Sequence, residues 1–174
     1  MIFLTVGTQV SFRRLAEAVD GWCADNPKTR VFGQLGAMSE DDYRPAHFSW
    51  VEFLDPADFS QRLASAELIV AHAGMGSIIS ALSLAKPIVI MPRRAELGEH
   101  RNDHQMATAR QMESRPGVHV AWRDEDLAPK LDGLVGAGAG ARQNGIAPFA
   151  DRRLTDGLRR FIFAGQPVFG EQTT

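Results

Sequence analysis

Residues 98–105, GEHRNDHQ, form the densest cluster of chemically versatile side chains in this sequence. Glu99, His100 and His104 can each act as a general base or a metal ligand, and the two histidines have the i, i+4 spacing of one helix face. A metal site would need a third, distant ligand, and the HExxH order of helical zinc sites is absent. The spacing does not select one of these groups, or His72 earlier in the chain, as a catalytic base.

Hydrogen bonding is the alternative chemistry for the same stretch. Asn102 or Asp103 would cap a helix, while the imidazoles and Gln105 would bond to a ligand or to backbone groups. We favour hydrogen bonding, because the single cysteine of the chain, Cys23, cannot build a cysteine-based metal site. The sequence therefore predicts no metal and no bound cofactor.

A second stretch, HAGMGSIISAL at residues 72–82, lies where an apolar strand at 68–71 should turn into a helix. A helix start leaves amide hydrogens unpaired and carries partial positive charge, so it can bind a phosphate if no side chain obstructs the approach. Gly74 and Gly76 remove that obstruction, and Ser77 adds a hydroxyl donor. The alternative is that the glycines only permit a tight turn.

Two further segments follow predicted strands and carry polar groups. Gly7, Thr8 and Gln9 come directly after the first strand. Arg93 and Arg94 follow an apolar strand later in the chain, where a pair of guanidinium groups could bind a diphosphate or a carboxylate in bidentate fashion. Surface ion pairs in a solvated loop are the alternative interpretation of these arginines.

Two common nucleotide-binding motifs are missing from the chain. Residues 72–82 have no third glycine at the interval of a dinucleotide fingerprint, and the Gly-Lys-Ser/Thr of a P-loop is absent throughout. The sequence GAGAGA at 136–141 follows a predicted helix and precedes no clear helix, so it does not match either motif.

Hydrophobic periodicity predicts an alternation of strands and helices along the first 135 residues. Strands are expected at 2–6, 30–35, 48–54, 68–71, 88–91 and 118–122. Helices are expected from an N-cap at Ser11, from Asp55-Pro56, and over 75–84, 102–113 and 124–135. This alternation requires crossover connections, and it predicts an α/β, Rossmann-like, doubly wound domain with a mostly parallel sheet.

In such a sheet, ligands bind beyond the carboxyl ends of the strands, where loops and helix starts converge. Residues 7–9, 72–77 and 92–105 all occupy that position. We expect these three segments to meet and form one binding site.

Composition limits the class of protein. A chain of 174 residues that is 44% hydrophobic suits one well-packed domain, and a formal charge of −2 lacks the basic excess of a nucleic-acid surface. We therefore expect no nucleic-acid partner. The amino terminus lacks the features of a signal peptide, and the chain has no apolar run near the ~20 residues that span a bilayer.

We divide the chain into a ligand-binding domain at 1–135, a Gly/Ala-rich linker or loop at 136–149, and a carboxyl-terminal helix and tail at 150–174. In the last segment, apolar residues recur at helical spacing beside a group of arginines. That helix would pack on the domain or face a partner chain or a membrane.

Four quoted segments together resemble a known family: FLTVGTQ at 3–9, AHAGMGSIISAL at 71–82, KPIVIMPR at 86–93 and NDHQMATA at 102–109. They are similar to the carboxyl-terminal domain of family 28 glycosyltransferases, which are UDP-sugar enzymes of the GT-B fold. The resemblance covers about residues 1–125. PRRAELGEHRNDHQ further resembles the small subunit of two-part bacterial exopolysaccharide glucuronosyltransferases, which are similar to the eukaryotic GlcNAc transferase subunit acting on dolichol-linked sugar.

The resemblance implies roles for particular residues. Those expected to approach the diphosphate and ribose are Gly7, Thr8, Gln9, Gly74, Met75, Gly76 and Ser77, while His104 and Gln105 would contact the nucleotide or its sugar. Ser80 departs from the family pattern, because many relatives carry there a glutamate that binds the ribose. The remaining candidates for substrate binding are His72, Arg93, Arg94, Glu99, His100 and Asn102.

The function implied is inverting transfer of a sugar, glucuronic acid on this resemblance, from UDP to a lipid-linked acceptor in exopolysaccharide biosynthesis. A membrane-associated partner subunit would bind the acceptor and carry the base; within this chain His72, Glu99 and His100 are the candidates for that base. The protein would be cytoplasmic and recruited to the inner face of the membrane through the partner. The alternatives are a self-sufficient homodimeric transferase and a non-catalytic module that binds a nucleotide sugar.

Overall fold

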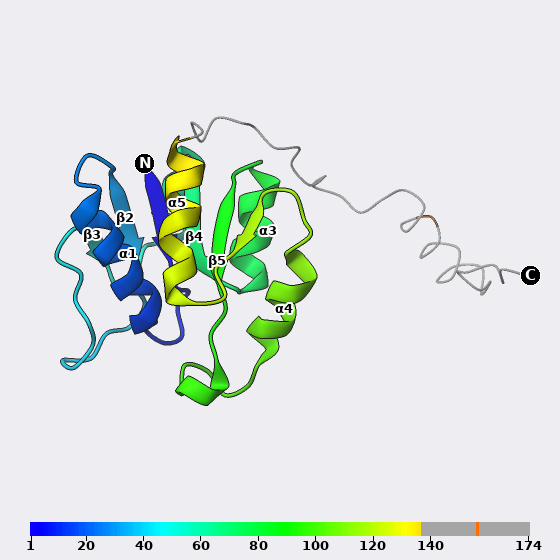
Figure 1. The fold of residues 1–174 in the computed structure, drawn as a ribbon, viewed down its shortest axis with the longest axis horizontal. Helices are drawn as coiled ribbons and strands as arrows, with labels where there is room; N and C mark the ends of the chain where they lie inside the picture. The colour runs from blue at the N-terminus through cyan, green and yellow to red at the C-terminus, as the bar shows by residue number, and fades with distance from the viewer. Residues whose placement is uncertain (137–155, 157–174) are drawn as a thin grey trace, which may run out of the picture.

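Six parallel strands form one sheet in the order β3-β2-β1-β4-β5-β6 (Figure 1). The strands are β1 (Ile2–Thr5), β2 (Val31–Gln34), β3 (Ser49–Val51), β4 (Leu68–His72), β5 (Ile88–Met91) and β6 (Val118–Val120). This computed structural model describes residues 1–136 and Asp156. Apart from Gly136 and Asp156, the predicted linker and carboxyl-terminal helix lie outside the described residues.

Helices cover both faces of the sheet, and the central strands β1 and β5 are accordingly buried along their whole length (Figure 1). The helices are α1 (Arg13–Asp25), α2 (Pro56–Ser65), α3 (Met75–Ser83), α4 (His104–Met112) and α5 (Leu127–Gly136). One core packs α1 and α5 against one face, and a second core packs α2, α3 and α4 against the other. The predicted α/β, Rossmann-like class is confirmed, with every strand pair parallel.

The strand order reverses between β1 and β4. These two strands are neighbours, with Thr5 paired to Ala71, yet the chain runs outward from β1 through β2 and returns to β4. At such a switch point the loops that follow the two strands diverge to opposite faces and leave a crevice at their carboxyl ends. The segments after β1 and β4 are the predicted ligand-binding residues 7–9 and 72–77.

Local hydrogen bonding explains where the predicted boundaries hold and where they fail. Asp55 caps α2 as predicted, because its Oδ1 accepts from the N–H groups of Ala57 and Asp58 at 2.8 Å each. The prediction of Ser11 as a cap was wrong: α1 begins after Phe12, and the Ser11 hydroxyl donates instead to Asp42. That acceptor lies 31 residues away, so no local pattern indicates it.

The other boundary differences are short. β3 spans only Ser49–Val51, and α4 begins at His104 rather than at 102. Short 3₁₀ turns occupy Ala95–Leu97, where none was predicted, and Asp124–Asp126, which was predicted as the start of a helix. None of the helices within residues 1–136 has the length and apolar character that a bilayer crossing requires.

Candidate functional site

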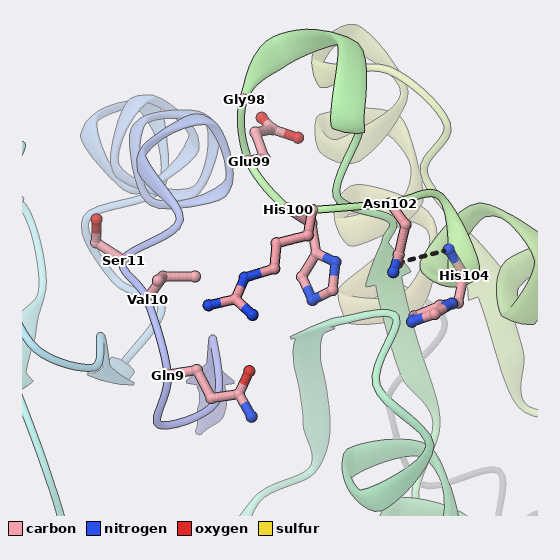
Figure 2. A pocket seen from close by; sticks show the side chains of 9 residues that line it. Gln9, Val10, Ser11, Gly98, Glu99, His100, Asn102 and His104 are labelled. Atoms are coloured by element: carbon pink, nitrogen blue, oxygen red, sulfur yellow. Dashed lines mark hydrogen bonds between the residues drawn. The ribbon is translucent and has the colours of Figure 1, made fainter.

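An open cleft of about 930 Å³ lies between the β1–α1 loop and the β5–α4 loop (Figure 2). Its lining residues are Gln9, Val10, Ser11, Gly98, Glu99, His100, Arg101, Asn102 and His104. A smaller cavity of about 50 Å³ is lined by Val6, Gly7, Thr8, Gln9, Val10, His72, Arg93, His100 and Gln105. The loops after β1 and β5 therefore meet His72, the last residue of β4, at one corner of the domain.

His72, the last residue of β4, explains two of the glycines. Gly7 has φ +83°, a left-handed conformation that favours glycine, and a Cβ there would lie 3.0 Å from His72 Cε1. A Cβ on Gly74 would collide with His72 Nε2. The backbone after β1 and the backbone after β4 thus both approach the same imidazole, and part of the glycine requirement is packing rather than ligand access.

The environment of His72 keeps its ring neutral at neutral pH. Burial lowers the pKa of His72 to about 4, and the neighbouring Arg93 cation acts in the same direction. A neutral imidazole donates or accepts a hydrogen bond but brings no charge to a ligand. His72 is therefore suited to positioning, and as a base it would be weak.

The start of α3 has the open backbone that the sequence indicates. Gly74 is its N-cap and provides no side-chain cap, and the first intrahelical bond runs from Ile78 N–H to Gly74 O. The N–H groups of Met75, Gly76 and Ser77 consequently have no acceptor within the helix. A Cβ on Gly76 would meet no atom within 4 Å, so packing does not require glycine there. This helix start lies beside His72 rather than in the lining of either cavity.

The predicted anion-binding role of Arg93 does not match its contacts. Arg93 is only 2% exposed, and its guanidinium lies 4.5 Å from the centroid of the Phe12 ring. It donates to the carbonyl oxygens of Val6 at 3.1 Å, Val10 and Ser11 at 2.7 Å each, and Glu99 at 3.4 Å. Arg93 therefore fastens the β1–α1 loop to the β5–α4 loop, and its cation is used inside the protein.

The guanidinium of Arg94 also contacts groups of the protein itself. Its Nη2 donates to Trp122 O at 2.6 Å, and its Nη1 lies 3.5 Å from Glu96 Oε1. Arg94 lines neither of the two cavities. The predicted grip of this arginine pair on a diphosphate or carboxylate is thus not formed by the contacts in the structure.

Glu99 lines the cleft, but its carboxylate is bonded to other groups of the protein. Its carboxylate accepts from Arg14 Nε at 2.6 Å, from Arg14 Nη2 at 2.8 Å and from the Arg94 N–H at 2.8 Å. Both oxygens of this carboxylate are therefore already bonded to donors of the protein. Among the three base candidates, these contacts argue against Glu99.

His100 and His104 lie next to each other in one wall of the cleft. Their ring centroids are 5.8 Å apart, and the rings are arranged edge to face (Figure 2). Asn102 Oδ1 accepts from the His104 N–H at 3.4 Å, while Asp103 Oδ1 accepts from the Ala95 N–H. Figure 2 shows Gln9 extending from the opposite loop toward His100. In the part of the chain that the structure describes, no three His, Cys, Asp or Glu side chains are grouped to hold a metal ion.

Gln105 connects the α4 start to the strand before it. The residue is 9% exposed, and its Oε1 accepts from the Arg93 N–H at 3.2 Å. Its side chain lines the small cavity behind the cleft. The prediction that Gln105 forms hydrogen bonds is confirmed for this backbone partner.

Two residues of the site, Arg14 and Arg101, were not predicted from the sequence. Arg14 holds Glu99 from α1, and Arg101 lines the cleft. Arg14 gives no sequence signal, because its partner lies 85 residues away. Arg101 lies inside the GEHRNDHQ stretch, and its position there was the available signal.

The parallel sheet and its switch point define a Rossmann-like α/β domain with the fold of the carboxyl-terminal half of GT-B glycosyltransferases. Residues 1–132 match the glycosyltransferase family 28 C-terminal domain. The chain therefore belongs to that family.

Three relatives indicate the range of similarity. An 82-residue segment, 45% of this chain, is 32% identical to the UDP-N-acetylglucosamine–N-acetylmuramyl-(pentapeptide) pyrophosphoryl-undecaprenol N-acetylglucosamine transferase of Paramagnetospirillum magneticum and spans 21% of it. The kitacinnamycin glycotransferase has the same fold, with a TM-score of 0.59, 20% identity and coverage of 96% of this chain and 40% of that one. The solution structure of ALG13 gives a TM-score of 0.57 at 17% identity, covering 90% of this chain and 93% of that one.

Proposed function

We propose that this protein binds the UDP-sugar donor of an inverting glycosyltransferase. The observation that carries the proposal is the convergence of the β1 and β5 loops on the end of β4, at the switch point of a family 28 C-terminal domain. Polar side chains of these two loops line a cleft of about 930 Å³, which is large enough for a nucleotide sugar.

The chemistry of the site suits a diphosphate leaving group. Transfer breaks the bond between the sugar and the β-phosphate, so negative charge grows on the departing UDP. The unpaired N–H groups of Met75, Gly76 and Ser77 at the start of α3 can stabilise that charge. Gly7, Thr8 and Gln9 on one side, and Asn102, His104 and Gln105 on the other, would hold the donor in position.

We place the catalytic base on a second polypeptide. Glu99 is bound to Arg14, and the pKa of His72 is lowered to about 4, so neither suits proton abstraction at neutral pH. His100 is the base candidate of this chain whose ring reaches the cleft (Figure 2). A membrane-associated subunit that binds a lipid-linked saccharide would complete the enzyme and recruit this cytoplasmic chain to the inner face of the membrane.

The two-part arrangement is supported by the extent of the similarities. The fold of this chain covers 93% of the solved ALG13 chain, whereas the matching 82-residue segment spans only 21% of the undecaprenol-linked transferase. A domain of this size therefore makes up nearly all of one solved relative. We retain glucuronic acid as the proposed donor sugar and exopolysaccharide synthesis as the proposed process, on the resemblance of residues 92–105 to the bacterial small subunits.

Calorimetric titration of the purified protein with UDP, UDP-glucose, UDP-N-acetylglucosamine and UDP-glucuronate tests the donor proposal. We expect binding of UDP and tighter binding of one UDP-sugar. Failure of all four to bind at millimolar concentration would overturn the proposal, provided that circular dichroism shows a folded protein.

A separate assay tests the need for a partner. Sugar transfer would be measured with the protein alone, with membranes from cells that lack it, and with the two combined. We expect transfer only in the combination. Full transfer by the protein alone would reject the two-part arrangement and favour the homodimeric alternative.

A further inference from the structure

The charge of the large cleft is decided by few side chains. Among its lining residues, Glu99 is the acidic side chain and Arg101 is the arginine. Arg14 neutralises Glu99 through two hydrogen bonds of 2.6 and 2.8 Å. The cleft therefore presents the positive charge of Arg101 without a competing negative charge.

The neighbouring arginines cannot perform the same task. Arg93 donates to four backbone carbonyl groups, Arg94 to Trp122 O, and Arg14 to Glu99, Asp124 and Pro92 O. Arg101 is exposed, and within residues 1–136 it forms no ion pair and no side-chain hydrogen bond. It is the arginine of the β5–α4 loop whose donors remain available to a ligand.

From this arrangement we infer that Arg101 is the residue that contacts the anionic oxygens of the donor and contributes to donor specificity. The inference rests on the proposed function, because it places the donor in the cleft. A guanidinium binds a phosphate or a carboxylate through paired N–H donors, whereas an ammonium acts as a point charge. Arg101 takes the role that the sequence suggested for Arg93 and Arg94.

The surroundings of Arg101 complete an anion site. His100 and Asn102, the residues on either side of Arg101 in the sequence, also line the cleft (Figure 2). The N-cap of α4, Asp103, forms no side-chain cap, and although Asn102 accepts from the His104 N–H, the N–H groups of Gln105 and Met106 have no acceptor within the helix. The opposite wall contributes the neutral side chains of Gln9 and Val10, which do not compete for the cation.

A UDP-linked uronic acid has two anionic groups that could accept hydrogen bonds from Arg101. One is the diphosphate, which every UDP-sugar carries, and the other is the sugar carboxylate. They are distinguished by binding measurements with UDP, UDP-glucose and UDP-glucuronate on the full chain. The variants are Arg101→Ala, Arg101→Lys and, as a control, Arg115→Ala. Arg115 is also exposed, but it precedes β6 and therefore lies at the amino ends of the strands, whereas Arg101 follows the carboxyl end of β5.

We expect Arg101→Ala to weaken binding by about tenfold or more, the usual effect of losing a hydrogen-bonded charge. A loss shared by all three ligands assigns Arg101 to the diphosphate, and a loss confined to UDP-glucuronate assigns it to the carboxylate. Arg101→Lys should recover only part of the loss, and Arg115→Ala should bind as the wild type does.

The inference is wrong if Arg101→Ala binds all three ligands with wild-type affinity. That outcome differs from failure of the proposed function, in which the wild type itself binds no uridine nucleotide. Because the side chain is exposed, the variant should keep the wild-type melting temperature, which the same preparations can verify.

Discussion

The guanidinium of Arg14 holds the carboxylate of Glu99 through two hydrogen bonds, Nε to Oε1 at 2.6 Å and Nη2 to Oε2 at 2.8 Å. The two side chains are 13% and 12% exposed, so the pair is largely shielded from water. Arg14 lies on α1 and also donates to Pro92 O and to Asp124, so it links the helix to the chain on both sides of α4. One residue outside the cleft thereby shapes its wall.

Arg14→Ala should destabilise the protein by about 2–4 kcal/mol, because removing one partner leaves a shielded charge unpaired. Glu99→Gln should cost less, since an amide oxygen in place of Oε2 can still accept from Arg14 Nη2 and from the Arg94 N–H, and only the bond from Arg14 Nε is lost. Urea denaturation of the two variants measures which of them loses more free energy of unfolding. The reverse order would show that the pair does not position the loop as we describe.

Arg93→Lys should also lower the stability of the protein, by about 2–4 kcal/mol. A lysine ammonium cannot donate to all of the carbonyl groups that accept hydrogen bonds from the guanidinium. Burial lowers the pKa of Arg93 to about 10, so the side chain remains a cation at neutral pH. Amide hydrogen exchange in residues 7–12 should accelerate in the variant. The exposed control Arg115→Ala should exchange as the wild type does, and unchanged exchange in Arg93→Lys would refute the link.

The two glycines of HAGMGS should respond differently to alanine. Gly74→Ala should lower stability by about 1–3 kcal/mol, since the new Cβ meets His72 Nε2 in a packed region. Gly76→Ala should leave stability unchanged or raise it slightly, because the site is open and alanine favours a helix. If a phosphate approaches the start of α3, Gly76→Ala should nevertheless weaken UDP binding.

Thermal melting together with UDP titration measures both effects. Wild-type UDP affinity in Gly76→Ala and in the larger Gly76→Val would argue against a phosphate at this helix start. A melting temperature of Gly74→Ala equal to that of the wild type would contradict the packing explanation of Gly74.

Stability should fall as the pH drops from 7 to 5. The pKa of His72 is about 4 in the folded protein and about 6.5 when exposed, so the unfolded chain binds more protons in this interval. His72 alone should therefore remove about 2 kcal/mol of stability between pH 7 and pH 5. Burial also lowers the pKa of His119, which adds to the same trend.

Urea midpoints of the wild type and of His72→Gln at pH 7, 6 and 5 measure this dependence. The lowered carboxylate pKa values, such as that of Asp20, act only at more acidic pH and do not interfere. The variant should have a flatter profile, and a profile as steep as that of the wild type would assign the dependence to other groups.

The architecture of this protein was predictable from its sequence, because it depends on local and repeated signals. Period-2 and period-3.6 patterns identify the strands and helices, and alternation of the two implies a parallel sheet. Since parallel strands share one carboxyl edge, the meeting of the loops after β1 and β5 with the end of β4 also followed from the chain order alone. The boundaries that failed, such as the start of α1, depend on hydrogen bonds to distant residues.

The use of each charged side chain was decided only by the tertiary structure. Arg93, Arg94 and Arg101 lie within nine residues of one another and are the same residue type, so no local pattern separates them. Three of the four carbonyl groups that accept from Arg93 lie more than 80 residues earlier in the chain, and the arginine that binds Glu99 lies 85 residues earlier than Glu99. A buried cation must satisfy its donors within the protein, and only the folded chain determines which arginine is buried and which remains available in the cleft.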